Sequence, residues 1–207
     1  MAKGIEVIER ENKELASNVL RDALIEDPMF QYMFKDPNRS SLTKMFFNYI
    51  IYKSYSMKEY LIGIRNGQTL TSVAIVETPC SIKGKQIFKR FGFILKSIIF
   101  LMKLPKTSTK FILQYMKITT NARPKSNHHY LVCIGVDPMH QKKGYAREML
   151  NHIHEIVDKD PYSTGIGLDT ENLVNVEIYK KFGYELVSET PIGEITIYCM
   201  FRKKKKC

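Results

Sequence analysis

The chain has 207 residues, of which 44% are apolar and 11% aromatic, and its formal net charge at pH 7 is +11. This length and composition suit one globular domain with a substantial core, and they fit neither a disordered chain nor a repeat array. The positive charge predicts affinity for anions, which could belong to a phosphorylated cofactor, a nucleic acid or a membrane surface.

The sequence contains no cysteine or histidine spacing typical of a metal site or a disulfide framework. Its four scattered cysteines are Cys80, Cys133, Cys199 and Cys207. Residues 1–15 carry acids and lack an apolar core of signal-peptide length, so we expect a cytoplasmic protein. The most apolar run, 91–104, is interrupted by lysines and is too short to span a bilayer. We therefore expect no metal and no membrane span.

The N-terminal quarter is predicted to be mainly helical after a short edge strand at residues 4–8. An apolar face over residues 15–23 predicts a helix, which stops at Asp27 because the residue before a proline is pushed out of the helical region. A second long helix is predicted to be capped by Ser40 or Ser41.

Residues 60–64 and 69–76 are rich in β-formers and are joined by Arg-Asn-Gly-Gln. Asn-Gly favours a tight hairpin, since both central residues then take positive φ. These residues predict an antiparallel pair of strands.

A basic segment follows the hairpin. No acidic residue occurs between Glu77 and Asp137, whereas eleven lysines and arginines do. Helical spacing of apolar residues predicts one helix over 87–99 and a second over 111–116. We expect both to pack one face on the sheet, with binding to a membrane or nucleic acid as the alternative.

Next comes a strand, loop and helix. Residues 130–136 (YLVCIGV) predict a buried strand that ends at an Asp-Pro pair, and apolar spacing predicts a helix from Ala146. The intervening loop can bind phosphate, because a helix N-terminus offers free amides and Gly144 has no side chain to block a ligand from the backbone. Lys142 and Lys143 add charge. The alternative is an ordinary turn with a solvated lysine pair.

The C-terminal part predicts a parallel strand over 164–169, which completes a βαβ unit. A helix over 171–182 and a strand pair over 184–189 and 194–201 follow. Residues 203–207 are predicted to form a frayed basic tail.

Three of these pieces together resemble the GCN5-related N-acetyltransferases. They are the strand ending in Val136-Asp137-Pro138, the loop QKKGYA (141–146) and the sequence YKKFGY (179–184). In that family the acetyl-CoA loop reads Q/R-x-x-G-x-G/A, and the next helix reads N-x-x-A-x-x-x-Y-x-x-x-G-F/Y. Tyr179 follows Gly144 by 35 positions, as the family spaces it.

The resemblance implies an α/β fold of the GNAT type. Its central sheet is mixed, mostly antiparallel and of about six or seven strands, with flanking helices and a βαβ cofactor unit. We expect one such domain over residues 1–202, with a basic helical insertion at about 81–125. The chain departs from the pattern at Ala146, where many members have Gly, and at Asn175, which occupies the place of the usual small residue.

The resemblance also implies acetyl-CoA as cosubstrate. The loop amides would hold its pyrophosphate, and Ile134 and Val136 would offer backbone groups to the pantetheine and the thioester carbonyl. Asn172 and Asn175 are candidates for the pantetheine arm, with a helix cap as the alternative role of Asn172. The expected cofactor-binding residues are Ile134, Val136, Gln141, Lys142, Lys143, Gly144, Tyr145, Ala146, Asn172, Asn175 and Tyr179.

Acetyl transfer to an amine needs a neutral amine, a stabilised oxyanion and a proton for the departing thiolate. The family pattern places Tyr179 as the acid, and the alternative is an amphipathic core tyrosine. His128 and Asp169 are candidate bases, since a histidine titrates near neutrality and ligands collect beyond strand C-termini. Each could equally be structural. Cys133 in mid-strand is expected to be a core residue and not a nucleophile.

The sequence thus predicts an acetyl-CoA-dependent N-acetyltransferase that acts directly on a primary amine of a small molecule. The alternatives are a protein or peptide N-acetyltransferase, a non-catalytic acetyl-CoA-binding regulatory module, and a nucleic-acid or membrane binder that uses the basic helices. No nucleic-acid partner is expected, and a homodimer is left open. If the basic helices border the acceptor, their charge would select acidic or phosphorylated acceptors.

Overall fold

The computed structural model describes residues 4–35, 37–79 and 87–205. Seven strands form one sheet in the order β1-β2-β3-β4-β5-β7-β6. Neighbouring strands are antiparallel except β4 and β5, which are parallel and connected through α6. The strands are β1 (Gly4–Val7), β2 (Tyr60–Asn66), β3 (Thr69–Glu77), β4 (His129–Val136), β5 (Gly165–Thr170), β6 (Glu185–Ile192) and β7 (Ile195–Lys203). The predicted mixed, mostly antiparallel α/β fold is confirmed.

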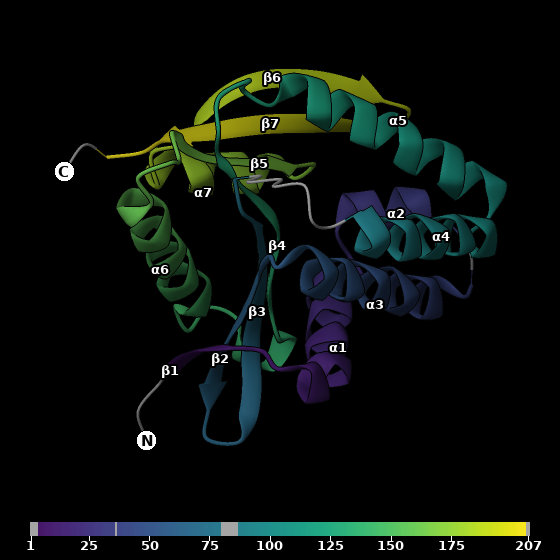
Figure 1. Ribbon diagram of the computed structural model, residues 1–207, viewed down its shortest axis with the longest axis horizontal. Coiled ribbons are helices and arrows are strands. Elements are labelled where there is room, and N and C mark those ends of the chain that lie inside the picture. The colour runs from purple at the N-terminus through teal and green to yellow at the C-terminus, as the bar shows by residue number, and fades with distance from the viewer. Residues whose placement is uncertain (1–3, 36, 80–86, 206–207) are drawn as a thin grey trace.

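Helices cover both faces of the sheet, with α6 on one side and α1 and α3 on the other, while α5 runs along β6 and β7 (Figure 1). The helices are α1 (Lys13–Leu24), α2 (Pro28–Met33), α3 (Arg39–Met57), α4 (Ile87–Lys103), α5 (Lys106–Ala122), α6 (Tyr145–Lys159) and α7 (Leu173–Lys181), with 3-10 turns η1 (Arg10–Asn12) and η2 (Pro138–His140). No helix in the described ranges combines the length and hydropathy needed to cross a membrane.

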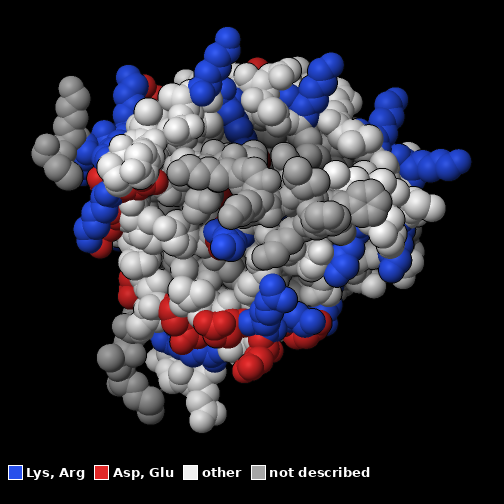
Figure 2. Space-filling model, viewed as in Figure 1, with Lys and Arg blue, Asp and Glu red and all other residues white. Residues whose placement is uncertain are grey.

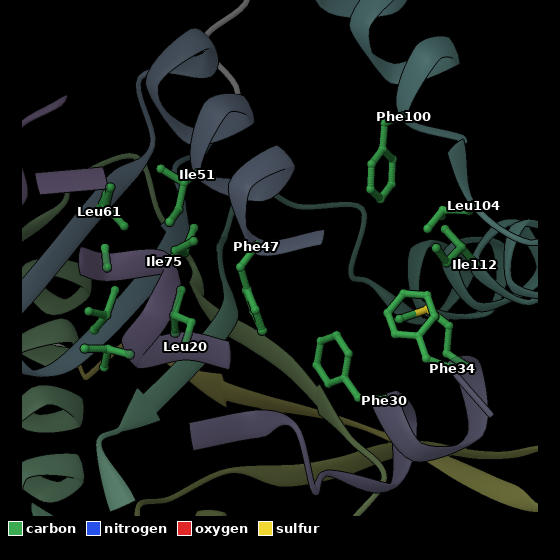
Figure 3. Packing of buried hydrophobic residues seen from close by; sticks show 14 of the residues in the cluster. Leu20, Phe30, Phe34, Phe47, Ile51, Leu61, Ile75, Phe100, Leu104 and Ile112 are labelled. Carbon is green, nitrogen blue, oxygen red and sulfur yellow. The ribbon is translucent and has the colours of Figure 1, made fainter. Parts of the chain in front are cut away.

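Each face of the sheet has its own apolar core. On the α6 side, Met149, Ile153 and Val157 pack on strand residues such as Ile166. On the other side, a core rich in phenylalanine joins α1, α2 and α3 to the sheet and reaches α4 and α5 (Figure 3). These two cores fix α6 and the α1–α2 connection on opposite faces of the central strands.

Helices α4 and α5 exist as predicted, but they do not both pack on the sheet. The Phe100 ring of α4 stacks on Tyr49 of α3 at 4.1 Å between centroids, so α4 packs mainly on another helix. Helix α5 packs on α2, β6 and β7. The Ser108 hydroxyl of α5 donates to the Met33 carbonyl of α2 at 2.6 Å. The aromatic surface of α3 supplies an apolar partner for α4 away from the sheet.

The predicted helix cap at Ser40 or Ser41 is wrong. Helix α3 begins at Arg39 and Asn38 precedes it, so both serines lie inside the first turn. The hairpin turn is also displaced by one residue. Asn66 pairs with Thr69, and only Gly67, at φ 63°, takes a positive φ.

The predicted frayed tail at 203–207 is wrong for its first three residues. Strand β7 extends through Lys203, which pairs with Gly165 of β5. The Lys204 amide donates to the Thr164 carbonyl at 2.9 Å, so the sheet orders the backbone beyond β7 as well. Residues 206–207 and Cys80 lie outside the described residues, and Cys133 and Cys199 are free thiols.

Candidate functional site

The two parallel strands separate toward their C-terminal ends. Strands β4 and β5 pair only between residues 129–131 and 166–168. Beyond this point β4 continues along β3 to Val136, whereas β5 continues along β7 to Thr170. The separation begins at an irregularity, because Val76 pairs with Leu131 and Ile75 with Cys133, which leaves Val132 as an extra residue. We call this unpaired stretch the gap between the central strands.

Backbone groups of Ile134 and Val136 point into this gap. The Asp137 amide donates to the Thr71 carbonyl at 2.9 Å, so these two residues form a hydrogen-bonded antiparallel pair. Alternation along the ladder then turns the amides and carbonyls of Val136 and Ile134 away from β3. The Gln141 side-chain amide donates to the Val136 carbonyl at 3.3 Å, and no described strand pairs with the Val136 amide. This is the geometry that the predicted roles of both residues require.

The loop at the end of β4 leads directly into α6. The Asp137 carboxylate accepts from the Met139 amide at 2.9 Å and starts η2. Lys142 and Gly144 then take positive φ, at 61° and 88°, and Gly144 is the N-cap of α6 without a side-chain cap bond. A Cβ at Gly144 would meet nothing within 4 Å, so the backbone there is open to a ligand.

This loop suits a phosphate group. No described acceptor takes the amides of Lys142, Gly144 or Ala146, and the positive end of the α6 dipole lies beside them. The Lys143 ammonium donates to the Met139 carbonyl at 2.9 Å, which stiffens the loop. The Tyr145 side chain is buried in the core, so this residue can serve a ligand only through its backbone.

The two predicted asparagines lie where β5 passes into α7. The Asn172 side chain accepts from the Val174 amide at 2.9 Å and caps α7, so the structural alternative for this residue is confirmed. The Asn175 side chain donates to the Thr170 hydroxyl at 3.3 Å. Both side chains thus help to set the start of the helix that carries Tyr179.

Tyr179 lies on α7 with its ring against Tyr184 at 5.5 Å. Among the described residues none forms a hydrogen bond with the Tyr179 hydroxyl, which leaves it available as a donor. Burial raises the pKa of Tyr179 above its usual value, and the charges of Asp169 and Asp27 raise it further. The phenol therefore keeps its proton at neutral pH, as an acid must.

Three carboxyl groups gather beside Tyr179, and we call Asp27, Asp169 and Glu171 the carboxylate cluster. They come from the α1–α2 connection, the end of β5 and the loop that follows it. The Tyr115 hydroxyl of α5 lies between Asp169 and Glu171 and bonds to both, while the Tyr130 hydroxyl donates to the other oxygen of Asp169. One phenol proton cannot serve two carboxylates fully, so the pair of acids favours a shared extra proton.

Electrostatics in the cluster agree with this arrangement. Burial raises the pKa of all three carboxyl groups, and the charges of Asp169 and Asp27 help to hold that of Glu171 well above its usual value. No described lysine or arginine forms an ion pair with any of the three. The nearby Arg123 guanidinium pairs with Glu77 at 2.6 Å. The cluster thus has no ion-pair partner among the described residues, and an incoming cation would supply one.

Of the predicted catalytic residues, the structure brings together Tyr179 and Asp169 but not His128. The His128 ring lies before the start of β4, with Nδ1 2.7 Å from the Ser126 carbonyl oxygen and the ring edge-on to Phe201. Val136 is eight residues further on, which corresponds to about 26 Å along a strand. Burial raises the pKa of the Cys133 thiol to about 12, which agrees with a core residue.

Sequence reasoning missed Asp27, Tyr115 and Glu171. Glu171 offered a signal, since it lies two positions beyond Asp169 at the end of the same strand. Asp27 was interpreted only as a helix stop and Tyr115 only as part of an apolar helix face. Helix α5 turns Tyr115 toward the carboxylates while its lysines are exposed, so the selection of acidic acceptors by these basic helices stays a conditional prediction.

The cluster predicts a pH-dependent cost to stability. A carboxyl whose pKa is higher in the folded chain destabilises it increasingly as pH rises from the unfolded value of about 4.3. We expect Glu171→Gln to raise the free energy of unfolding near about pH 8, with the gain vanishing near about pH 4. Urea unfolding across this pH range measures the effect.

Glu77→Gln is the control with the opposite sign. Burial alone would raise the pKa of Glu77, but Lys53 at 2.7 Å and Arg123 outweigh it and lower the pKa. This substitution is expected to cost about 1–3 kcal/mol at neutral pH and less as Glu77 of the wild type becomes protonated. Equal pH profiles for the two variants would contradict the assignment of Glu171.

Comparison with known proteins gives a consistent family signal. A model of the acetyltransferase (GNAT) family matches residues 112–184. An uncharacterized N-acetyltransferase of Schizosaccharomyces pombe, C550.08, is 23% identical over 189 residues, which are 86% of this chain and 72% of that protein.

Solved structures share the fold over nearly the whole chain. A Corynebacterium glutamicum protein described as histone acetyltransferase HPA2 and related acetyltransferase matches with a TM-score of 0.73 at 16% identity, covering 100% of this chain and 99% of its own. Arylalkylamine N-acetyltransferase 2 from Aedes aegypti matches with a TM-score of 0.71 at 13% identity, and the match covers 99% of this chain and 100% of that chain. The PaiA N-acetyltransferase of Thermoplasma acidophilum, in complex with coenzyme A, matches with a TM-score of 0.59 at 14% identity, and the match covers 98% of this chain and 99% of that chain.

Proposed function

Because this chain belongs to the GCN5-related N-acetyltransferase (GNAT) superfamily, we propose that it transfers the acetyl group of acetyl-CoA directly to a primary amine of a small, positively charged molecule. The observation that carries the proposal is the carboxylate cluster beside Tyr179, where the central strands separate. An ammonium group would find compensating charge there, whereas an acidic acceptor would be repelled.

The cosubstrate fits the residues of the β4–α6 connection. Acetyl-CoA supplies an activated acyl group together with a pyrophosphate that needs several donors. The amides of the 141–146 loop and the N-terminus of α6 would hold the pyrophosphate, with Lys142 exposed beside them. The backbone groups of Ile134 and Val136 would align the pantetheine along β4, and the Val136 amide would stabilise the oxyanion, worth about 10²–10³ in rate.

Proton transfer would use the two sides of the gap. The acceptor arrives as an ammonium ion and must lose a proton before it attacks. We assign this proton to Glu171, because burial and the charges of Asp169 and Asp27 hold the pKa of its carboxyl well above its usual value. Asp169 accepts from two phenols and would hold the charge in place. Tyr179 would donate its proton to the departing thiolate.

The Aedes aegypti arylalkylamine N-acetyltransferase shares this fold, which supports a small-molecule acceptor as the first choice. We further propose a reducing, cytoplasmic location, which the two free thiols of the described chain support.

Thiol release from acetyl-CoA tests the function over a panel of arylalkylamines, diamines, α-amino acids and lysine peptides. We expect turnover with amines that carry no carboxylate and little with α-amino acids, because the cluster repels their carboxylates. Acetyl-CoA binding without thiol release for any amine would overturn the proposal in favour of a regulatory module. Turnover confined to peptides would favour a protein N-acetyltransferase.

The cofactor loop is tested at Gly144. An alanine at φ 88° costs about 1–2 kcal/mol, so the free loop of Gly144→Ala is expected to leave this conformation, and acetyl-CoA must restore it on binding. We therefore expect acetyl-CoA binding to weaken about 5- to 30-fold in calorimetry. Gly67→Ala, at φ 63° in the β2–β3 turn, is the matched control, with similar strain and no expected effect on acetyl-CoA. Equal affinities of the Gly144 variant and the wild type would contradict the assignment of the loop.

A further inference from the structure

The outer side of α4 is apolar over residues 93–103, and none of the described residues covers it. Five of its side chains, Ile94, Leu95, Ile98, Ile99 and Met102, are between 43% and 78% exposed. Helical spacing places them opposite Ser97, Phe100 and Leu104, which pack inward. On α5, Leu113 and Met116 are 53% and 57% exposed. We call these seven side chains the α4–α5 face. Exposed aliphatic side chains grouped on one side of a helix mark an interaction surface.

Lysines accompany this face, and acids do not. Residues 87–122, which make up both helices and their connection, contain no Asp or Glu. Lys96, Lys103, Lys106, Lys110 and Lys117 of this segment are exposed. Figure 2 shows basic side chains projecting along the upper and right edges of the molecule, where Figure 1 places α5 and α4, while acidic side chains gather lower down. The charge is thus asymmetric over the face that Figure 2 shows.

We propose that the α4–α5 face docks on an anionic lipid bilayer. Aliphatic side chains on one side of a helix, with lysines beside them, are the pattern of helices that lie in the membrane interface. The apolar side chains would enter the region between headgroups and acyl chains, and the lysines would attract anionic headgroups. The enzyme would then be a peripheral membrane protein, independently of which amine it acetylates.

Charge and chemistry favour lipid over the other occupants. A second copy related by a two-fold axis would bring the same lysines together, and like charges across an interface are unfavourable. A nucleic acid would use the lysines but not the aliphatic side chains, since base stacking relies on aromatic and arginine side chains. Only an anionic bilayer matches both parts of the surface.

Lipid binding and acetyl transfer can be measured separately, because they would use different sides of α5. Tyr115 bonds to the carboxylate cluster from the inner side of α5, whereas Leu113 and Met116 are exposed on its outer side. Substitutions on the outer side should therefore change lipid binding without changing thiol release in the absence of vesicles.

The test is co-sedimentation of the full-length protein with phosphatidylcholine vesicles, with and without about one third phosphatidylserine. We expect binding to the anionic vesicles that falls steeply between about 50 mM and about 500 mM salt. Leu95→Ser/Ile98→Ser/Met102→Ser and Lys103→Glu/Lys106→Glu/Lys110→Glu should each weaken binding by on the order of 10²-fold. The matched controls are Val7→Ser/Leu15→Ser and Lys13→Glu/Lys159→Glu/Lys203→Glu, which alter exposed residues elsewhere.

Three results would overturn the proposal. The first is no binding of the wild type to anionic vesicles. The second is equal loss in the lysine variant and its charge-matched control, which would mean that net charge alone attracts the protein. The third is concentration-dependent self-association that the serine variant abolishes while vesicle binding persists unchanged, which would make the face a contact between copies. Circular dichroism of each variant confirms folding before binding is compared.

Discussion

Tyr179→Phe is expected to lower kcat by about 10²–10⁴-fold while the KM for acetyl-CoA stays nearly constant. The phenylalanine keeps the ring contact with Tyr184 but removes the phenol that we propose as the proton donor to the departing thiolate. Burial and the carboxylate cluster raise the pKa of Tyr179 above its usual value of about 10, so the wild-type phenol remains protonated throughout the neutral and mildly alkaline range. The initial rate of thiol release with the best amine of the panel, at saturating substrate, measures kcat.

Tyr184→Phe is the matched control for this effect. Its hydroxyl bonds to His154 Nε2 at 3.0 Å inside the core, so its loss is expected to cost about 1 kcal/mol of folding stability and to change kcat only a few-fold. Retention of more than half of the wild-type kcat by Tyr179→Phe would show that another group, or water, protonates the thiolate.

The second large effect concerns the carboxylate cluster. Glu171→Gln is expected to lower kcat/KM for the amine about 10²–10⁴-fold, because it removes the proposed base. Asp27→Asn is expected to lower it about 10- to 10²-fold, because it removes a charge that would pair with the ammonium. Both variants keep the side-chain shape, so acetyl-CoA affinity should not change.

The pH profile separates the two roles. A base works when deprotonated, so wild-type kcat/KM should rise with pH through the pKa of Glu171, which burial and the neighbouring carboxylates hold above its usual value. Glu171→Gln should lose this acid limb, whereas Asp27→Asn should keep it and move it to lower pH. Glu177→Gln, an exposed acid on α7 that pairs with Lys180 at 2.7 Å, is the control and should match the wild type. An unchanged acid limb in Glu171→Gln would refute its role as the base.

The cofactor half of the site could be predicted because it is local in sequence. The strand end, the loop 141–146 and the helix that follows are contiguous in the sequence. The spacing of apolar residues identifies the strand and the helix, the Asp-Pro pair marks the strand end, and the small residues mark the loop. The backbone of such a loop binds phosphate whatever the distant chain does. Tyr179 was found through the spacing of a known pattern, which also depends only on order along the chain.

The acceptor half could not be predicted, because it depends on long-range contacts. Tyr115 and Glu171 are separated by 56 positions, and their contact forms because α5 packs on β6 and β7. The sequence showed a basic segment and left open whether it borders the acceptor, whereas the fold exposes the lysines of α5 and turns Tyr115 inward. Burial then decides the protonation of the carboxyl groups, and burial is a tertiary property.

By itself, the sequence determined the order of strands and helices along the chain, the parallel β4–α6–β5 unit and the position of the loop 141–146, since each follows from hydrophobic period, turn residues and chain order within short windows. Only the tertiary structure decided where the central strands separate, which backbone groups enter the gap and which carboxyl groups meet there. It also decided that α4 packs on α3 and leaves an apolar side exposed. These features depend on which surfaces bury one another. Burial of apolar area is determined by contacts over the whole chain and not within any one segment.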